Sequence, residues 1–322
     1  MMKLDALRPS PFSAEGKHFI KLSDYSTGEL LYLLDSALEM KNLQKKGIPH
    51  PYLSGKILGM IFEKSSTRTR VSFEVGMKQL GGDAIFLSSN DIQLGRGETV
   101  EDTAKVLSRY LDGLMIRTFG HETIERFANH AEVPVINGLT DLHHPTQVMA
   151  DLLTIYEHKG KLAGLKLCYI GDGNNNMCHS LLEGAVSVGM DIAVASPAGY
   201  APNAHILQEV KAKANEMNVS VSFTTSAHEA AHEADIIVTD VWTSMGQEEE
   251  AAQRLEAFTP YQVNAELCSQ AKADFLFLHC LPAHRGEEVT ADIIDGSHSV
   301  VFDEAENRLH AQKAILKALL EN

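Results

Sequence analysis

Hydroxyl groups and arginines gather in the stretch Phe62-Glu63-Lys64-Ser65-Ser66-Thr67-Arg68-Thr69-Arg70-Val71-Ser72-Phe73-Glu74. The apolar residues 57–62 predict a buried strand before it, and residues 71–80 predict a helix that ends at Gly81-Gly82. The start of a helix presents free N–H groups and the positive end of its dipole, which together favour an anion. The stretch therefore predicts a phosphate site, although it lacks the glycines of a P-loop. The plainer interpretation is a capped helix with solvated arginines.

Within this stretch, three hydroxyls and one arginine are the candidate phosphate ligands. Ser66, Thr67 and Thr69 can each donate a hydrogen bond. The planar guanidinium of Arg68 can hold two phosphate oxygens at once.

Length and charge limit the classes of protein that fit. The chain has 322 residues, of which 44% are hydrophobic and 22% charged, so we expect two globular domains with real cores. Its net charge of −15 argues against general binding of nucleic acid or of an anionic membrane. An anionic substrate is still compatible, provided that positive groups are concentrated at one site.

The four cysteines, Cys168, Cys178, Cys268 and Cys280, form no C-x-x-C pair, which argues against a zinc site. The N-terminal residues have no apolar signal-peptide core, and no apolar run reaches the length of about 18 residues that a membrane span needs. We therefore expect a cytoplasmic protein with reduced thiols and without a bound metal.

Strand-like and helical patterns alternate along the whole chain, which is typical of parallel sheets covered on both faces. We expect an α/β fold with two doubly wound domains, each with a central parallel β-sheet flanked by helices. Residues 1–148, joined by a C-terminal helix at about 305–322, form one domain, and residues 149–304 form the other. The predicted strands are 57–62, 84–87, 113–117, 133–137, 165–170, 192–195, 219–223, 234–239, 275–278 and 300–302. The predicted helices are 27–45, 71–80, 101–110, 124–130, 146–158, 180–188, 204–217 and 305–320, while 1–17 and 88–99 look irregular.

Ligands of such sheets bind beyond the carboxyl ends of the strands. Polar and charged residues cluster at those ends, namely residues 66–69, Arg117, His144, residues 172–176, Asp240 and His279-Cys280. The clustering predicts that they share a site.

Arg117 and the segment 141–147 extend the positive, hydrogen-bonding character of this site. Arg117 ends a predicted strand, where it is either a solvated arginine or a second cation for the anion. His143 and His144 are adjacent, so their side chains diverge and do not suit a metal pair. His144 and Gln147 are one helical turn apart, so both can reach one small polar group, such as a carbonyl oxygen that gains negative charge.

Residues 171–176, Gly-Asp-Gly-Asn-Asn-Asn, begin like a dinucleotide fingerprint but have Asn176 where the third glycine would stand. This departure disfavours a nucleotide-dependent dehydrogenase. The asparagines suit a small polar ligand, and Asn176 could bind an α-carboxylate.

Two further strand ends carry candidate ligands for an amino acid. Asp240 could hold an ammonium group, and Gly246 allows its loop to move. The acidic residues 248–250 that follow are expected to be a solvated helix face. Cys280 is either a structural thiol or, beside His279, an accessible functional one, and the Leu281 carbonyl could accept a hydrogen bond from an amine.

Together these motifs resemble, in the same order over residues 60–310, those of the aspartate/ornithine carbamoyltransferase family. Residues 66–69 (Ser-Thr-Arg-Thr) and 144–147 (His-Pro-Thr-Gln) are similar to motifs of the whole family. Residues 240–246 and 279–282 (His-Cys-Leu-Pro) resemble those of its ornithine branch. One departure is the run of three asparagines where many relatives have two, so either Asn175 or Asn176 is the carboxylate ligand.

The resemblance implies transfer of the carbamoyl group from carbamoyl phosphate to the δ-amine of L-ornithine, giving L-citrulline and phosphate, in arginine metabolism and without a cofactor. It implies that the first domain binds carbamoyl phosphate and the second ornithine, and that Arg117, His144 and Cys280 are catalytic. The implied carbamoyl phosphate ligands are Ser66, Thr67, Arg68, Thr69, Gln93, Arg117, His144, Gln147 and Arg308. The implied ornithine ligands are Asn176, Asp240, Ser244, Met245, Cys280 and Leu281. A homotrimer or a multiple of trimers is also implied, in which Gln93 reaches the neighbour's site. Putrescine or acetylornithine are the alternative amines.

Overall fold

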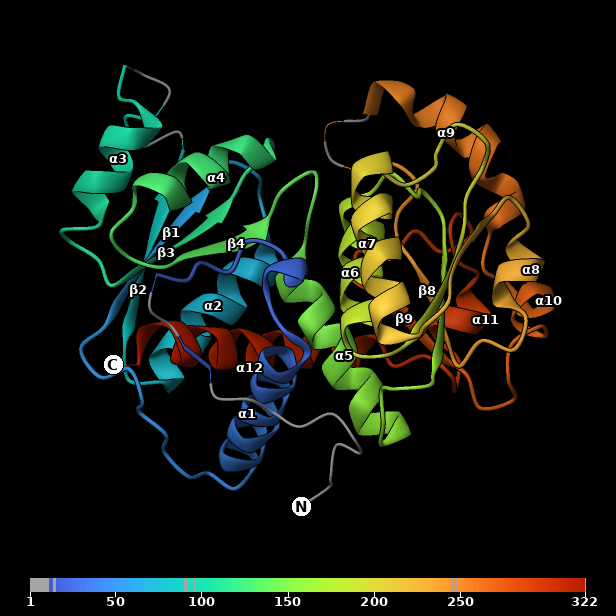
Figure 1. The fold of residues 1–322 in the computed structure, drawn as a ribbon, viewed down its shortest axis with the longest axis horizontal. Helices are drawn as coiled ribbons and strands as arrows, with labels where there is room; N and C mark the ends of the chain where they lie inside the picture. The colour runs from blue at the N-terminus through green and yellow to red at the C-terminus, as the bar shows by residue number, and fades with distance from the viewer. Residues whose placement is uncertain are drawn as a thin grey trace. The chain divides into compact units, whose positions relative to one another are not determined.

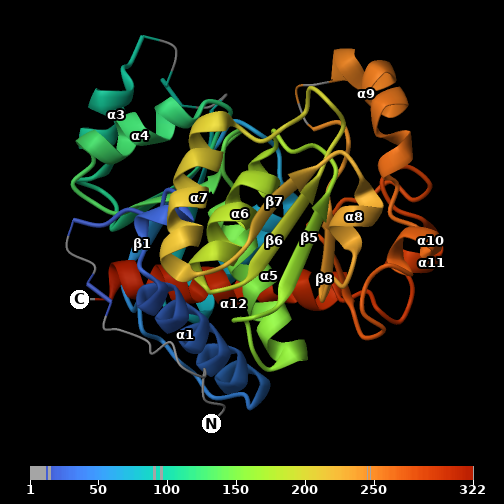
Figure 2. The same ribbon diagram turned by 45° about the vertical axis from the view of Figure 1, so that its right-hand side comes forward.

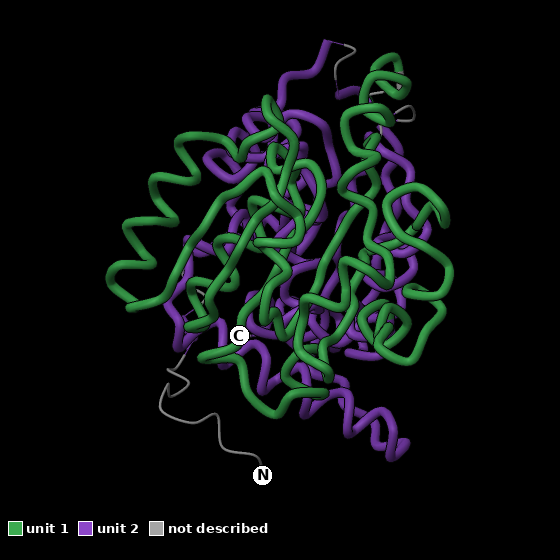
Figure 3. The backbone as a smooth tube through the Cα atoms, turned by 90° about the vertical axis from the view of Figure 1, so that its right-hand side faces the viewer, with its two compact units in different colours: residues 1–3, 154–305 green, residues 4–153, 306–322 purple. Residues whose placement is uncertain are grey.

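The computed structural model describes residues 12–13, 16–89, 92–94, 97–244, 246 and 248–321. The chain forms two compact units, coloured in Figure 3. Unit 1 runs from Thr154 to Ala305, and unit 2 comprises the described residues before Thr154 and those from Glu306 onward. We expected the divisions at 148/149 and 304/305, and they fall at 153/154 and 305/306.

Unit 2 contains a four-stranded parallel sheet in the order β2-β1-β3-β4. Its strands are β1 (Ile57–Phe62), β2 (Asp83–Ser88), β3 (Gly113–Arg117) and β4 (Val135–Leu139). Figure 1 shows α3 (Val100–Leu107) and α4 (His121–His130) on one face, and α1 (Thr27–Lys45), α2 (Thr67–Gln79) and α12 (Val301–Leu320) on the other. The predicted α/β architecture is confirmed for this unit.

Alternation along the strands explains why helices cover both faces of this sheet. Ile61, Leu114 and Ile116 point to one face, where they pack with Ile124 and Phe127 of α4. The neighbouring positions point to the other face and are buried as well. A parallel sheet with two apolar faces needs such a double cover.

Unit 1 contains a five-stranded parallel sheet in the order β7-β6-β5-β8-β9. Its strands are β5 (Lys166–Ile170), β6 (Asp191–Ala195), β7 (Val221–Thr224), β8 (Ile236–Thr239) and β9 (Leu276–His279). In Figure 2, α6 (Asn176–Ser187) and α7 (Ala204–Met217) lie on one face and α8 (Ala227–Ala231) on the other, where α10 (Ala265–Cys268) and α11 (Ala291–Ile294) also pack. The other helices and 3-10 turns of the described chain belong to different units. The turn η1 (Leu22–Asp24) lies in unit 2, and α5 (Pro145–Lys159) runs from unit 2 into unit 1. Helix α9 (Ala251–Phe258) and the turns η2 (Glu248–Glu250) and η3 (Thr259–Tyr261) lie in unit 1.

Several predicted boundaries are wrong in ways that matter for the site. Helices α2 and α6 begin at Thr67 and Asn176, each four residues before the predicted start, so the polar residues lie in the first turn of each helix. The predicted strand 300–302 is instead the start of α12, because a short apolar run does not distinguish a strand from a buried helix. Residues 248–250 form a 3-10 turn that leads into α9.

No helix among the described residues is both long and apolar enough to cross a membrane.

Candidate functional site

The N-terminus of α2 lies directly after β1, as the sequence predicted. Ser66 caps the helix, and its hydroxyl accepts a hydrogen bond from the Thr69 backbone N–H at 3.1 Å. This bond keeps the first turn in shape and leaves the remaining N–H groups of the turn directed out of the helix end. Thr67 is exposed, Arg68 is half-buried and Thr69 is buried.

Two contacts that the sequence did not reveal hold the turn between β1 and α2. The ammonium of Lys64 pairs with the Asp141 carboxylate and lies 4.2 Å from the centre of the Phe119 ring. The Thr118 hydroxyl donates to the Glu63 carboxylate. Both contacts join residues far apart in the sequence, and no local pattern could have predicted them.

The structure brings Arg308, Thr69 and Gln147 into direct contact. The guanidinium of Arg308 donates to the Gln147 side-chain oxygen at 2.6 Å and to the Thr69 hydroxyl at 3.1 Å. Gln147 in turn donates to Asp151 at 2.8 Å. All of these side chains are buried, so the C-terminal helix α12 is locked to the first turns of α2 and α5.

His144 lies among three positive charges. Burial first, and then the charges of Arg308, Arg117 and Arg68, hold the pKa of His144 well below its usual value. The imidazole is therefore neutral at pH 7, with one nitrogen able to donate and one able to accept. Arg117 is buried at the carboxyl end of β3, where the pairing with β4 is interrupted by a register shift.

Unit 1 brings together a second group of predicted residues. One carboxylate oxygen of Asp240 accepts from the Val241 N–H at 2.8 Å and lies 3.2 Å from the Cys280 sulfur. The other accepts from the Asn175 side-chain amide at 3.3 Å, and the same amide lies 3.5 Å from the Ser244 hydroxyl. Asp240 is buried, whereas Cys280 is partly accessible.

Asn175 and Asn176 occupy different positions on α6. Asn175 caps the helix, with its side-chain oxygen accepting from the Met177 N–H at 2.6 Å. Asn176 is the first residue of the helix and is half-buried. The structure thus gives Asn175 a role in organising the turn and leaves Asn176 at the positive end of a twelve-residue helix.

His279 supports the turn that contains Cys280 and Leu281. Its Nδ1 accepts from the Leu281 N–H at 2.9 Å, so its Nε2 carries the proton and donates to Glu288 at 3.2 Å. His279 and Glu288 are both fully buried. Leu281 has φ = 56°, a backbone conformation that costs a non-glycine residue about 1–3 kcal/mol.

Asp240, His279 and Cys280 place one potential metal-ligand atom each within 4.8 Å of one another. Both nitrogens of His279 already have hydrogen-bond partners within the protein. A metal would have to replace one of these bonds, so the arrangement does not favour a resident metal ion.

The structure leaves two of the predicted features untested, Gln93 and Met245, and accounts for a third, His143. Gln93 is exposed, and its prediction depends on a second subunit. Met245 lies outside the described residues, as do residues 1–11 of the expected N-terminal arm and parts of 88–99. His143 is buried with its ring centroid 4.9 Å from that of His121, which accounts for it without a metal.

Comparison with known proteins gives a consistent result over nearly the whole chain. Residues 17–157 match the family model described as the carbamoyl-P binding domain of aspartate/ornithine carbamoyltransferase. Residues 163–319 match the Asp/Orn binding domain of the same family.

Individual relatives support the same assignment. The ornithine carbamoyltransferase of Anoxybacillus flavithermus is 60% identical over 306 residues, which cover 95% of this chain and 97% of the relative. That of Carboxydothermus hydrogenoformans is 59% identical, covering 96% and 99%. The solved structure of ornithine carbamoyltransferase from Pyrococcus furiosus superimposes with a TM-score of 0.92 at 50% identity, covering 95% of this chain and 97% of that one.

Proposed function

This chain belongs to the aspartate/ornithine carbamoyltransferase family, and on that premise we propose that it transfers the carbamoyl group of carbamoyl phosphate to the δ-amine of L-ornithine. The products are L-citrulline and phosphate. The curated relatives at about 60% identity, which are named ornithine carbamoyltransferase, favour ornithine over putrescine, acetylornithine or aspartate.

We assign carbamoyl phosphate to unit 2. The phosphate lies at the N-terminus of α2, where Ser66, Thr67, Arg68 and Thr69 supply backbone and side-chain donors. The buried Arg117 adds positive charge beneath it. The contact of Arg308 with both Thr69 and Gln147 carries this assignment, since it joins three sequence segments at one point.

The carbamoyl oxygen gains negative charge as the amine attacks, so donors fixed around it lower the barrier. His144, Gln147, Arg308 and Arg117 are the donors that we assign to it. A neutral His144 donates through one ring N–H without a second charge competing with the arginines for the anion. Removing one such donor typically costs about 3–4 kcal/mol of transition-state stabilisation.

We assign ornithine to unit 1. Asp240 and Ser244 hold the α-ammonium, while Asn176, at the N-terminus of α6, and the Met245 backbone hold the α-carboxylate. Cys280 and the Leu281 carbonyl orient the δ-amine. That amine has a pKa of about 10 in water, so it must lose a proton before it can attack. That first proton goes to the solvent. Once the nitrogen has bonded to the carbamoyl carbon it sheds a further proton, and the departing phosphate is the base that takes this one.

The chain's assembly and location complete the proposal. We infer a homotrimer in which Gln93 enters the neighbouring subunit's site, as the family resemblance implies, and a cytoplasmic enzyme of arginine metabolism. Exposed apolar residues on the edge strand β2 of unit 2, Ile85 and Phe86, support association through that side of the unit.

A direct assay tests the proposed reaction. Purified protein is given carbamoyl phosphate with equal concentrations of ornithine, putrescine, acetylornithine or aspartate, and phosphate release and carbamoylated products are measured. We expect product with ornithine at a rate well above the others. Faster turnover of another amine would reject ornithine as the substrate, and no product with any amine would reject the proposed reaction.

A nucleotide-dependent dehydrogenase, the remaining alternative, has only Gly171 and Gly173 in its favour. The family match and Asn176 in place of the third glycine both disfavour it.

A further inference from the structure

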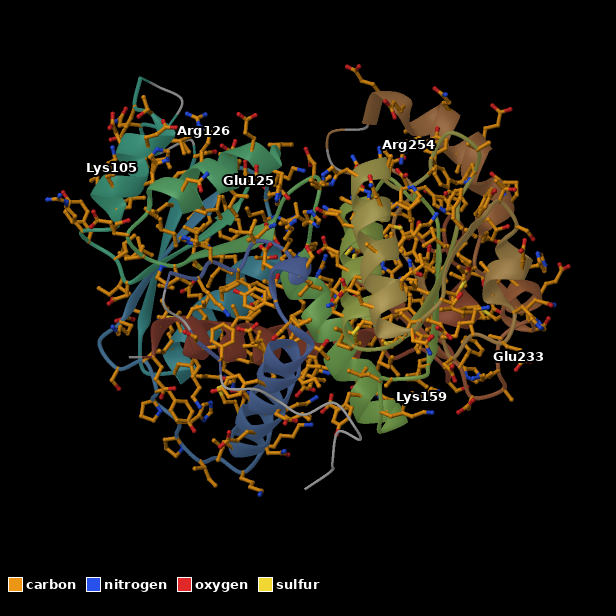
Figure 4. The ribbon with its side chains drawn as sticks, in the orientation of Figure 1. Lys105, Glu125, Arg126, Lys159, Glu233 and Arg254 are labelled. Atoms are coloured by element: carbon orange, nitrogen blue, oxygen red, sulfur yellow. The ribbon has the colours of Figure 1, made fainter. Side chains whose placement is uncertain are left out.

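Unit 1 contains a buried arginine that bonds to both turns of the proposed ornithine site. One turn is residues 171–176, after β5, and the other is residues 240–244, after β8. Arg254 projects from α9 and is labelled in Figure 4 on the inner side of that helix. Its side chain is only 4% exposed.

The contacts of Arg254 connect these turns in a defined way. Its Nε donates to the Trp242 carbonyl oxygen at 2.6 Å, in the middle of the 240–244 turn. Its Nη2 pairs with one carboxylate oxygen of Asp172. The guanidinium also lies 5.1 Å from the centre of the Tyr200 ring and 5.4 Å from that of Phe258, which keeps water away from it.

Asp172 forms the other half of this connection. Its second carboxylate oxygen accepts from the Asn174 N–H at 2.9 Å, which fixes the turn leading to Asn175 and Asn176. Burial raises the pKa of Asp172, whereas the charge and hydrogen bond of Arg254 act to lower it. Arg254 thus supplies the main opposing charge for a carboxylate that is only 4% exposed.

A purely structural ion pair is the alternative explanation. Such pairs contribute little net stability, because the cost of desolvation offsets the attraction. Helix α9 could pack through Phe258 and the aromatic contacts alone. Besides an i,i+4 pair with Glu250, Arg254 bonds to the backbone of the 240–244 turn and to the side chain of Asp172. Asp172 in turn bonds to the backbone of the 171–176 turn.

We propose that Arg254 and Asp172 are positioning residues that set the distance between the 171–176 and 240–244 turns, and thereby the affinity of the enzyme for ornithine. This inference rests on the ornithine site proposed above. Neither residue is among the ligands assigned to ornithine above, and both lie in unit 1. Their effect should therefore appear mainly in ornithine binding, while the carbamoyl phosphate ligands of unit 2 keep their arrangement.

The test compares Arg254→Met, Arg254→Lys and Asp172→Asn with the wild type. Misplacing a binding group by about 1 Å can cost about 100-fold, so we expect the KM for ornithine to rise by about 10- to 100-fold in Arg254→Met. The Kd for carbamoyl phosphate should not change. Arg254→Lys keeps the charge but has only one nitrogen, so it should recover part of the loss.

Two further variants make the result decisive. Arg285→Gln removes an arginine of the same unit from an exposed pair with Asp295 and should behave like wild type. The double variant Asp172→Asn/Arg254→Met should lose no more ornithine affinity than the worse single variant, because both changes break one connection.

Three outcomes can be separated. If Arg254→Met keeps the wild-type KM for ornithine while Asp240→Asn raises it, the positioning role is wrong and the ornithine site stands. If Asp240→Asn also has no effect, the proposed site itself is wrong. A weakened carbamoyl phosphate Kd together with a lowered Tm would show that Arg254 only stabilises the fold, which also overturns the inference.

Discussion

Three arginines act on a single imidazole, that of His144. Arg308, Arg117 and Arg68 lie close enough to lower its pKa, in addition to the effect of burial. Such a concentration of positive charge is unusual in a chain with a net charge of −15. It explains how an acidic protein can bind a doubly charged phosphate: the attraction is focused at one place instead of being spread over the surface.

Replacing Arg68 with Ala tests the phosphate assignment. We expect the KM for carbamoyl phosphate to rise by about 100-fold or more, since a charge-assisted, two-oxygen contact contributes about 2–3 kcal/mol or more. Steady-state kinetics with ornithine at saturation measure it. Arg126→Ala, which removes an exposed arginine of the same unit paired with Glu101, is the matched control and should be unaffected. Nearly normal turnover at low carbamoyl phosphate in Arg68→Ala would refute the assignment.

Replacing His144 with Ala tests the carbonyl donor. We expect kcat to fall by about 100- to 1,000-fold, because the lost N–H acts mainly on the charge that develops in the transition state. The KM for carbamoyl phosphate should change much less. His130→Ala, a partly exposed histidine at the end of α4, serves as the control. If instead the KM for carbamoyl phosphate rises by about 100- to 1,000-fold while kcat is unchanged, His144 binds the substrate in its ground state and is not a transition-state donor.

Helix α12 is unusual among the described elements because much of its buried face is polar. Lys313 is fully buried, and its ammonium has three acceptors, the side-chain oxygens of Gln44 and Gln79 at 3.0 Å and His50 Nε2 at 3.2 Å. These contacts connect α12 with α1, α2 and the segment before β1. The same helix carries Arg308, so this cluster helps to hold Arg308 against the first turn of α2.

The Lys313 cluster predicts a pH dependence of stability. Burial lowers the pKa of Lys313 from 10.5 to about 8. Between these two values the unfolded chain binds a proton that the folded chain has released, so stability rises with pH through this window. The gain is at most about 1.4 kcal/mol per pH unit. Urea unfolding at pH 8, 9 and 10 measures it.

Lys313→Met should remove this rise, whereas the exposed Lys46→Met should retain it. Differences between wild type and variant isolate the contribution of Lys313 from that of every other titrating group. Parallel stability curves for wild type and Lys313→Met would contradict the prediction.

Whether Gln93 takes part in catalysis depends on the proposed assembly of subunits. This residue is exposed, and our proposal places it in the site of a neighbouring subunit. Strand β2 is an edge strand with Ile85 46% and Phe86 36% exposed. Exposed apolar side chains on an open edge favour association with another chain, which would bring the segment after β2 close to that partner.

Subunit mixing tests this arrangement. Gln93→Ala and Arg68→Ala, each assembled only with copies of itself, should be nearly inactive at low carbamoyl phosphate. If Gln93 acts in the neighbour's site, hybrid trimers made by co-expression should regain activity, because about a quarter of randomly formed sites receive both intact residues. Mass measurement tests the proposed trimer independently. If the hybrids stay inactive, Gln93 acts within its own chain or not at all.

The sequence alone was sufficient to predict the two parallel sheets and the residues at their carboxyl ends. Strand and helix patterns depend on the periodicity of nearby apolar residues, and helix α1 (Thr27–Lys45) and strand β1 (Ile57–Phe62) were predicted to the residue. The candidate ligands follow from the same local logic, since polar residues after a buried strand have to lie at the edge of the sheet. The family motifs added their order and the implied roles.

Only the tertiary structure showed which side chains support these ligands. The short apolar run at 300–302 was wrongly predicted as a strand, because its burial depends on what packs against it. Arg254 with Asp172, and Lys313 with Gln44, join residues 82 and 269 positions apart. A buried charge is stabilised only by a partner in space, and nothing in the neighbouring sequence of either residue specifies that partner.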